Sequence, residues 1–209
     1  MAAVLDAIVV RHLGLVPYET ALTNMRAFTA SRDADTPDEL WVLQHPPVYT
    51  RGLAADPAFG PRAPVKVPVV QVERGGEVTY HGPGQAVVYT LVDLARRGIK
   101  VREFVALLEG AVISLLGAHE VAAARRARAP GVYVGEAKVA ALGIRVTRGR
   151  AFHGVALNVD LDLAPFESID PCGYPGLRVT RTRDLGIAEG CEAMGARLAA
   201  RLVEALDHA

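Results

Sequence analysis

The sequence predicts one α/β domain of the α+β type, spanning residues 1–209, in which helices cover a mixed, largely antiparallel β-sheet. Apolar segments of strand length are interleaved with two long segments of helical periodicity. These segments do not follow the regular strand–helix alternation of a doubly wound parallel sheet. The 209 residues are 51% hydrophobic and 22% charged, which is typical of a chain with one packed core.

The first half of the chain is expected to contain one helix and several strands. Residues 20–33 have an approximate apolar face and predict a helix. Residues 40–44 predict a strand, which the following prolines stop. Residues 52–68 are rich in proline, glycine and alanine and are expected to be irregular. Strands are expected at 67–73 and 86–94, with a glycine-rich loop between them.

The second half is expected to form a helix, a hairpin, a strand, a loop and a final helix, at residues 101–120, 131–146, 152–163, 165–180 and 187–206. Gly117 is positioned to end the first of these helices. Gly135 and Glu136 predict a two-residue turn in the hairpin.

Charge and composition exclude several classes of protein. With 23 basic and 23 acidic residues the formal net charge is +0, so we expect no nucleic-acid partner. The basic segment 124–129 is interpreted as a solvated surface turn. No apolar run reaches the roughly 18 residues of a membrane span, and residues 1–14 make a poor signal peptide, so we expect no membrane partner and a cytoplasmic location. Neither a phosphate-binding motif nor a metal-ligand spacing is present, so no cofactor and no metal are expected.

The two cysteines have different contexts. Cys191 begins an apolar helical stripe and is interpreted as a small buried residue. Cys172 lies in "DPCGYPG", a segment that cannot form a regular element and presents its side chains from a rigid loop. Spacing alone leaves two interpretations of Cys172 open, a nucleophile and a gap-filling residue.

A cysteine nucleophile reacts as the thiolate and needs a nearby cation or base. Lys138 is a candidate because it begins the apolar segment "AKVAALGIRV"; the ordinary alternative, which the residues alone favour, is that its stem packs while the ammonium reaches water. His81 and His153 each precede a glycine, which allows close approach of a ligand to the backbone. Each histidine also has an ordinary structural interpretation.

Five segments occur in this order: "HPPVYT" (45–50), "RGGEVTYHGPGQAVVY" (74–89), "PGVYVGEAKVAALGIRV" (130–146), "FHGVALNVDLDL" (152–163) and "DPCGYPG" (170–176). Together they closely resemble the octanoyltransferase family, the lipoyl(octanoyl)-acyl-carrier-protein:protein transferases. The resemblance covers about residues 40–180. It implies the fold of biotin- and lipoate-protein ligases.

The resemblance also implies an activity and a site. Family members move an octanoyl chain from acyl carrier protein to a lysine of lipoyl domains, in 2-oxoacid dehydrogenase E2 subunits and the glycine cleavage H protein. The acyl-thioester nucleophile falls on Cys172, and the lysine that activates it falls on Lys138. The substrate-binding segments fall on Arg74, Gly75, Gly76, Glu77, Val78, Thr79, Tyr80 and His81, on Ala141, Leu142 and Gly143, and on His153, Gly154 and Val155.

Three other functions remain open from the sequence. An ATP-dependent lipoate-protein ligase has the same fold but needs no cysteine nucleophile. A cysteine hydrolase acts on thioesters with water as acceptor, and an inactive module binds lipoyl domains without chemistry. The sequence gives no direct indication of oligomeric state, for which our expectation is a monomer.

Overall fold

The computed structural model describes residues 7–62 and 66–209, with only the backbone of residues 57 and 172. Its main sheet has seven strands in the order β1-β2-β6-β10-β9-β8-β7. The pairing is antiparallel throughout except between β1 and β2, which are parallel. The strands are β1 (Val9–Leu15), β2 (Glu39–Gln44), β6 (Gln85–Asp93), β7 (Ala124–Arg126), β8 (Ala129–Val134), β9 (Ala137–Thr147) and β10 (Arg150–Asn158).

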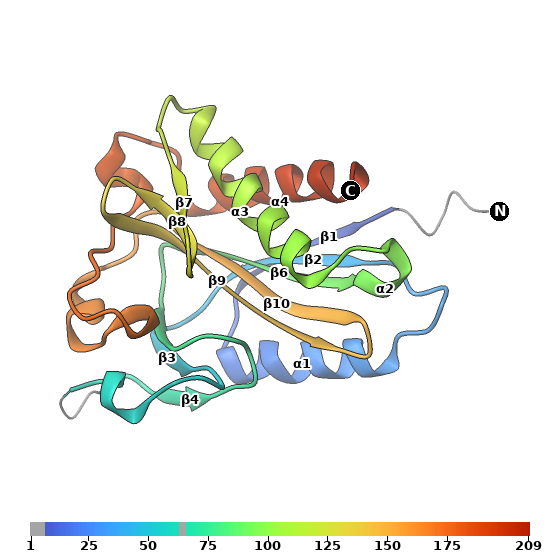
Figure 1. Ribbon diagram of the computed structural model, residues 1–209, viewed down its shortest axis with the longest axis horizontal. Helices are drawn as coiled ribbons and strands as arrows, with labels where there is room; N and C mark the ends of the chain where they lie inside the picture. The colour runs from blue at the N-terminus through green and yellow to red at the C-terminus, as the bar shows by residue number, and fades with distance from the viewer. Residues whose placement is uncertain (1–6, 63–65) are drawn as a thin grey trace.

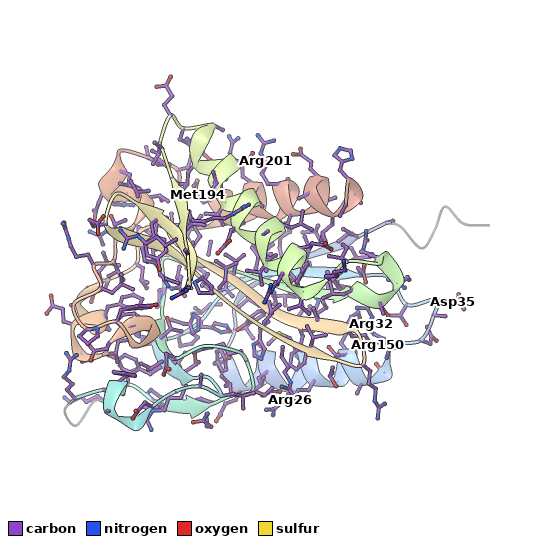
Figure 2. All side chains as sticks on the ribbon, in the orientation of Figure 1. Arg26, Arg32, Asp35, Arg150, Met194 and Arg201 are labelled. Atoms are coloured by element: carbon purple, nitrogen blue, oxygen red, sulfur yellow. The ribbon has the colours of Figure 1, made fainter. Side chains whose placement is uncertain are left out.

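Helices cover the two faces of this sheet unequally (Figure 1). The two long helices α3 (Val101–Gly117) and α4 (Cys191–Asp207) pack together on one face, and α1 (Tyr18–Ser31) lies on the other. The short helix α2 (Leu94–Arg97) follows β6. Figure 2 labels Met194 on α4 and Arg26 on α1, on opposite sides of the sheet. Within the described residues, no helix has the length and hydropathy needed to cross a bilayer.

Side-chain alternation along β6 explains why both faces are covered. Val88 and Val92 belong to the core under α3 and α4, whereas Val87, Tyr89 and Leu91 belong to the core under α1. Successive residues of a strand point to opposite faces, so a strand whose apolar residues fall on both faces must be covered on both sides.

A second, three-stranded sheet lies beside the α1 face. Its order is β4-β3-β5, with β4 (Val69–Gln71), β3 (Val48–Arg51) and β5 (Val78–His81). Tyr49 and Tyr80 pack against Phe166 to form a small separate core. Four 3₁₀ helices occupy the connecting segments: η1 (Pro57–Phe59), η2 (Ala164–Ser168), η3 (Pro171–Gly173) and η4 (Thr182–Leu185).

The predicted fold class is confirmed, and most predicted elements are present. The helix ending at Gly117 and the hairpin turn at Gly135-Glu136 are as expected. The segment 124–129 is not simply a turn, because its first three residues form β7.

The predicted strand 152–163 is too long, since β10 ends at Asn158. There the backbone N–H groups of Val159 and Asp160 both donate to the Gly84 carbonyl, which turns the chain away. The sequence also gave no indication of β1 or β5. The first is a largely exposed edge strand, and the second is only four residues long and follows a glycine pair.

The final helix begins at Cys191 rather than near Ile187. Met194, Leu198, Leu202 and Leu206 form the predicted buried stripe. Cys191 itself is half-buried at the helix start, and burial raises the pKa of its thiol to about 12. Such a thiol is protonated at neutral pH and unreactive.

Candidate active site

A pocket lies where the small sheet meets β9, β10 and the start of α1. It holds about 530 Å³ of space unoccupied by atoms, including its open mouth. Its walls are mostly apolar or aromatic, with a few polar groups, which is the usual character of a small-molecule site. The lining residues are Tyr18, Arg74, Gly76, Glu77, Val78, Thr79, His81, Val87, Tyr89, Ala141, Leu142, Gly143, His153, Gly154, Val155 and Ala156.

The structure brings together most of the residues that the sequence placed in the substrate-binding segments. All of them line this pocket except Gly75 and Tyr80. Tyr80 is buried in the core of the small sheet instead, where its ring contacts Tyr49 and Phe166. Gly75 acts through its backbone, because its N–H donates to the Ile144 carbonyl at 3.0 Å and so attaches the loop to β9.

Arg74 is the buried cation of the pocket wall. Its guanidinium donates to the Thr50 carbonyl (2.8 Å), to the Thr50 hydroxyl and to the Gly75 carbonyl (2.9 Å). A Cβ on Gly143 would lie 3.0 Å from Arg74 Cδ, so this glycine gives space to the arginine stem.

His81 lines the pocket, the His45 ring lies 5.8 Å from it between centroids, and both rings are hydrogen-bonded. His45 contacts the Val16 carbonyl through Nδ1 (2.7 Å) and the Tyr89 hydroxyl through Nε2 (2.6 Å). His81 contacts Gln85 Oε1 through Nδ1 (2.7 Å). Burial lowers the pKa of His45 to about 4 and that of His81 to about 3, so both rings are neutral at physiological pH.

His153 is held differently. It is only 1% exposed, and neither ring nitrogen has a hydrogen-bond partner among the described residues. Burial lowers its pKa to about 3, with a further contribution from the positive charge of Arg74. Its φ of +63° is unusual for a residue with a Cβ.

This left-handed backbone explains the direction of the His153 ring. Regular alternation along β10 would place His153 with Ala151 and Val155, which belong to the core under α3 and α4. The ring instead stacks on Phe152 and meets Tyr89 edge-on, and both of those residues belong to the α1-side core. The strained residue therefore turns its imidazole into the pocket, and strain of this kind is found at functional sites.

Lys138 is buried at 3% exposure at the start of β9. Its ammonium donates to the Pro130 carbonyl at 3.0 Å and lies 5.2 Å from the centre of the Tyr133 ring. Gly131 provides the space, because a Cβ there would lie 2.9 Å from Lys138 Cε and 3.1 Å from Nζ. The buried carboxylate of Glu109 accepts from the Gly131 N–H and keeps that glycine in place.

The backbone of Cys172 lies in η3, and its side chain is outside the described part of the structure. The segment after this loop is attached to β9 at Lys138. The Lys138 N–H donates to the Arg178 carbonyl (2.8 Å), and the Lys138 carbonyl accepts from the Thr180 N–H (2.9 Å). This short backbone pairing therefore holds the segment after the Cys172 loop against the strand that carries Lys138. Among the described side chains, no group of three or more metal-binding residues is found.

Several residues of this region were missed by the sequence reasoning. Tyr18, Val87, Tyr89 and Ala156 line the pocket, yet each belongs to an apolar pattern that indicates only burial. Gly131 is needed for close approach to Lys138, which no local pattern reveals. Gln85 and Asn158 are buried amides in strands, and a buried polar residue within an apolar run was the available signal.

Comparison with known proteins identifies the class to which this fold and pocket belong. Residues 17–198 match the family described as the lipoyl protein ligase A/B catalytic domain, so the chain belongs to that family. Within it, the chain belongs to the octanoyltransferases, enzymes that transfer an octanoyl group. It is 58% identical to the octanoyltransferase of Aromatoleum aromaticum over 92% of this chain and 83% of the relative. It is 53% identical to that of Dechloromonas aromatica over 95% of this chain and 97% of the relative. The resemblance inferred from the five motifs is thereby confirmed.

Solved structures confirm the predicted fold. A crystal structure of lipoate-protein ligase A bound with ATP superposes with a TM-score of 0.79 at 15% identity, over 95% of this chain and 85% of that one. The biotin protein ligase of Aquifex aeolicus superposes with a TM-score of 0.57 at 13% identity, over 97% of this chain and 70% of that one. At such identities the likeness concerns the fold alone.

Proposed function

We propose that the chain transfers an octanoyl group from octanoyl-acyl carrier protein to a lysine of a lipoyl domain, through a thioester on Cys172. The acceptors are lipoyl domains of 2-oxoacid dehydrogenase E2 subunits and of the glycine cleavage H protein. Membership of the octanoyltransferase family supports the reaction class. The observation that carries the assignment is that Lys138 is buried beside the pocket elements and paired through its backbone with the segment that follows the Cys172 loop.

Two acyl transfers account for the reaction. In the first, the sulfur of Cys172 bonds to the octanoyl carbonyl carbon, the bond from that carbon to the donor sulfur breaks, and the proton of the Cys172 thiol passes to the donor. In the second, the acceptor amine bonds to the same carbon, the bond to Cys172 Sγ breaks, and a proton from the amine returns to the Cys172 thiolate. Thioester exchange is nearly thermoneutral and amide formation is downhill, so the sequence of steps needs no activation by ATP.

Lys138 would favour the thiolate that the first step requires. A cationic ammonium stabilises the thiolate as an ion pair, whereas a neutral amine would take the thiol proton directly. Its hydrogen bond to the Pro130 carbonyl and its place by the Tyr133 ring restrain the side chain for either role.

The outer edge of β9 offers a donor for the developing oxyanion. The Ile144 carbonyl accepts from the Gly75 N–H rather than from β10. Because backbone groups alternate in direction along a strand, the N–H and C=O groups of Ile144 and Leu142 both point to the outer edge of β9. Gly143 points its N–H the other way, towards β10. The Leu142 N–H, which borders the pocket, is therefore the better candidate, and one such donor is typically worth about 3 kcal/mol.

Intact mass measurement tests the nucleophile. After incubation with octanoyl-acyl carrier protein, we expect one octanoyl adduct that hydroxylamine removes. Cys172→Ser should lose this thioester adduct. The matched control is Cys191→Ser, which should keep it, because that half-buried thiol is protonated. A thioester adduct that persists on the Cys172→Ser protein would refute the assignment, and an adduct that forms only with free octanoate and ATP would indicate a ligase.

The rate of cysteine alkylation at different pH values tests Lys138. We expect Lys138→Ala to slow alkylation of Cys172 near neutral pH, since the thiol loses its activating group. Lys66→Ala is the control, because Lys66 is exposed. Identical alkylation profiles for the wild type and Lys138→Ala would show that the lysine does not activate the thiol.

A further inference from the structure

A line of polar side chains crosses the buried region between Lys138 and Arg74. It runs through Asn158 at the end of β10, Gln85 at the start of β6, His81 on β5 and Thr50 on β3. The exposed fractions of these four residues are 4%, 1%, 7% and 0%. Buried polar groups of this kind are retained where each one finds a partner, so the direction of every hydrogen bond can be deduced.

The deduction begins at a backbone carbonyl, which can only accept. The Thr180 carbonyl accepts from Asn158 at 3.0 Å, so this atom of Asn158 is the amide nitrogen Nδ2. Asn158 Oδ1 therefore faces Gln85, and the Gln85 atom 2.9 Å away is Nε2. The same Gln85 nitrogen also donates to the Tyr80 carbonyl at 3.3 Å. Gln85 thus turns its only acceptor, Oε1, towards His81.

The amide pair in turn selects the tautomer of His81. Gln85 Oε1 lies 2.7 Å from His81 Nδ1, so Nδ1 carries the proton and Nε2 carries the lone pair. Thr50 Oγ1 lies 3.4 Å from His81 Nε2. This oxygen accepts from Arg74 at 2.8 Å, which leaves its own proton directed at His81 Nε2.

The charges around the ring favour its neutral form. Interactions with His45, Arg74 and His153 lower the pKa of His81, and Tyr18, another ionisable group, stacks on the ring at 5.8 Å between centroids. Burial is the largest contribution, whereas the hydrogen bond to Gln85 raises the pKa. A neutral ring has two possible tautomers, so the choice between them rests on the amides.

The two ends of the line belong to the two halves of the site. At one end, the Thr180 N–H donates to the Lys138 carbonyl, next to the segment that follows the Cys172 loop. At the other end, Arg74 lines the pocket, and the neighbouring Gly75 attaches to β9. A change of either amide would therefore reverse or interrupt the hydrogen bonds that join these halves.

We propose that Gln85 and Asn158 are positioning residues that hold His81 as the neutral Nδ1–H tautomer and thereby keep Arg74 and the Lys138 segment in register. Neither residue touches the reacting atoms. The kinetic part of this proposal rests on octanoyl transfer at this pocket, whereas the tautomer does not depend on what the pocket binds.

Nitrogen NMR of protein with ¹⁵N-labelled histidine tests the tautomer. The His81 signals are assigned by their absence from a His81→Phe spectrum. In the wild type we expect a protonated Nδ1 and an unprotonated Nε2. Gln85→Glu should keep this tautomer, because a carboxylate still accepts from Nδ1. Gln85→Met should give a mixture of tautomers, because the thioether is at best a weak acceptor. A wild-type His81 protonated on Nε2 would overturn the proposal, whatever the kinetics show.

Kinetics then test the consequence for catalysis. We expect Asn158→Asp to lower kcat about ten- to a hundredfold with a smaller change in KM, by analogy with the loss of groups that orient metal-bound histidines. The aspartate cannot donate to the Thr180 carbonyl. Asn24→Asp is the matched control on the exposed face of α1, with kcat unchanged. If Asn158→Asp folds, by circular dichroism, with unchanged kcat, the positioning role is wrong. If that variant does not fold, the wild-type tautomer and the kcat of Gln85→Met decide, since the methionine should lower kcat about tenfold.

Discussion

The two histidines of the pocket share a sequence context but not an environment. Each precedes a glycine, each is buried, and burial lowers the pKa of each to about 3. His81 has hydrogen-bond partners near both ring nitrogens, and its strand has ordinary backbone geometry. His153 has a left-handed backbone, and its ring nitrogens have no partner among the described residues. One wall of the pocket is therefore fully hydrogen-bonded in the free protein, whereas the ring nitrogens of His153 on the other wall are available to a ligand.

The glycines beside these histidines provide the largest expected contrast. A Cβ on Gly154 would overlap the Val88 carbonyl in the neighbouring strand and lie 3.2 Å from the Thr90 nitrogen. Backbone cannot yield, so we expect Gly154→Ala to lower the free energy of unfolding by more than about 3 kcal/mol. A Cβ on Gly82 would lie 2.6 Å from the Tyr80 hydroxyl oxygen, the far end of a side chain. Gly82→Ala should therefore cost only about 1–2 kcal/mol.

Urea unfolding followed by circular dichroism measures both variants, and equal m-values would show that the comparison is of native-state stability. If Gly154→Ala and Gly82→Ala lower the free energy of unfolding equally, β10 relaxes around the new methyl group at position 154. The backbone of the neighbouring His153 would then be less constrained than the structure indicates.

Replacement of each imidazole by phenylalanine should give a smaller contrast. His81→Phe leaves the Oε1 of Gln85 buried without its donor, and an orphaned polar group of this kind costs about 1–3 kcal/mol. His153→Phe orphans no described hydrogen-bond partner and should change the free energy of unfolding by less than about 1 kcal/mol. Octanoyl transfer should nevertheless fall in His153→Phe, because the ligand loses its polar contact.

Chemical denaturation with a parallel transfer assay distinguishes these outcomes. A His153→Phe protein that is as active as the wild type would show that the unpartnered ring nitrogens do not meet the substrate. A His81→Phe protein as stable as the wild type would show that the hydrogen bond to Gln85 contributes little.

The contrast between the histidines also marks how far the sequence could predict the site. Local patterns predicted the sheet, the covering helices and the hairpin that carries Lys138, because periodicity reports burial directly. Only the family resemblance placed His81 and His153 in one site. Local patterns could not show that His153 has a φ of +63° or that Gln85 meets His81, since both depend on contacts between strands that are distant in sequence.

Acid titration of stability gives the smallest expected effect. Because the folded pKa of each histidine is lowered to about 3 from an ordinary value near 6.5, the unfolded chain binds more protons between those two pH values. The contribution of each histidine to the free energy of unfolding is therefore fully present above about pH 6.5 and is lost progressively as the pH falls towards 3. A single such histidine should cost about 1 kcal/mol between pH 7 and 5.5.

The phenylalanine variants divide this acid dependence between the two walls. Each variant should remove about 1 kcal/mol of the loss between pH 7 and 5.5, measured by urea unfolding at both pH values. The shares should be equal, because burial is the largest cause of the lowered pKa in both histidines. If only His153→Phe flattens the profile, the hydrogen bond that His81 donates to Gln85 raises the pKa of His81 enough to offset its burial. The two walls would then differ in protonation as well as in geometry, and His81 would carry a charge in mild acid while His153 stayed neutral.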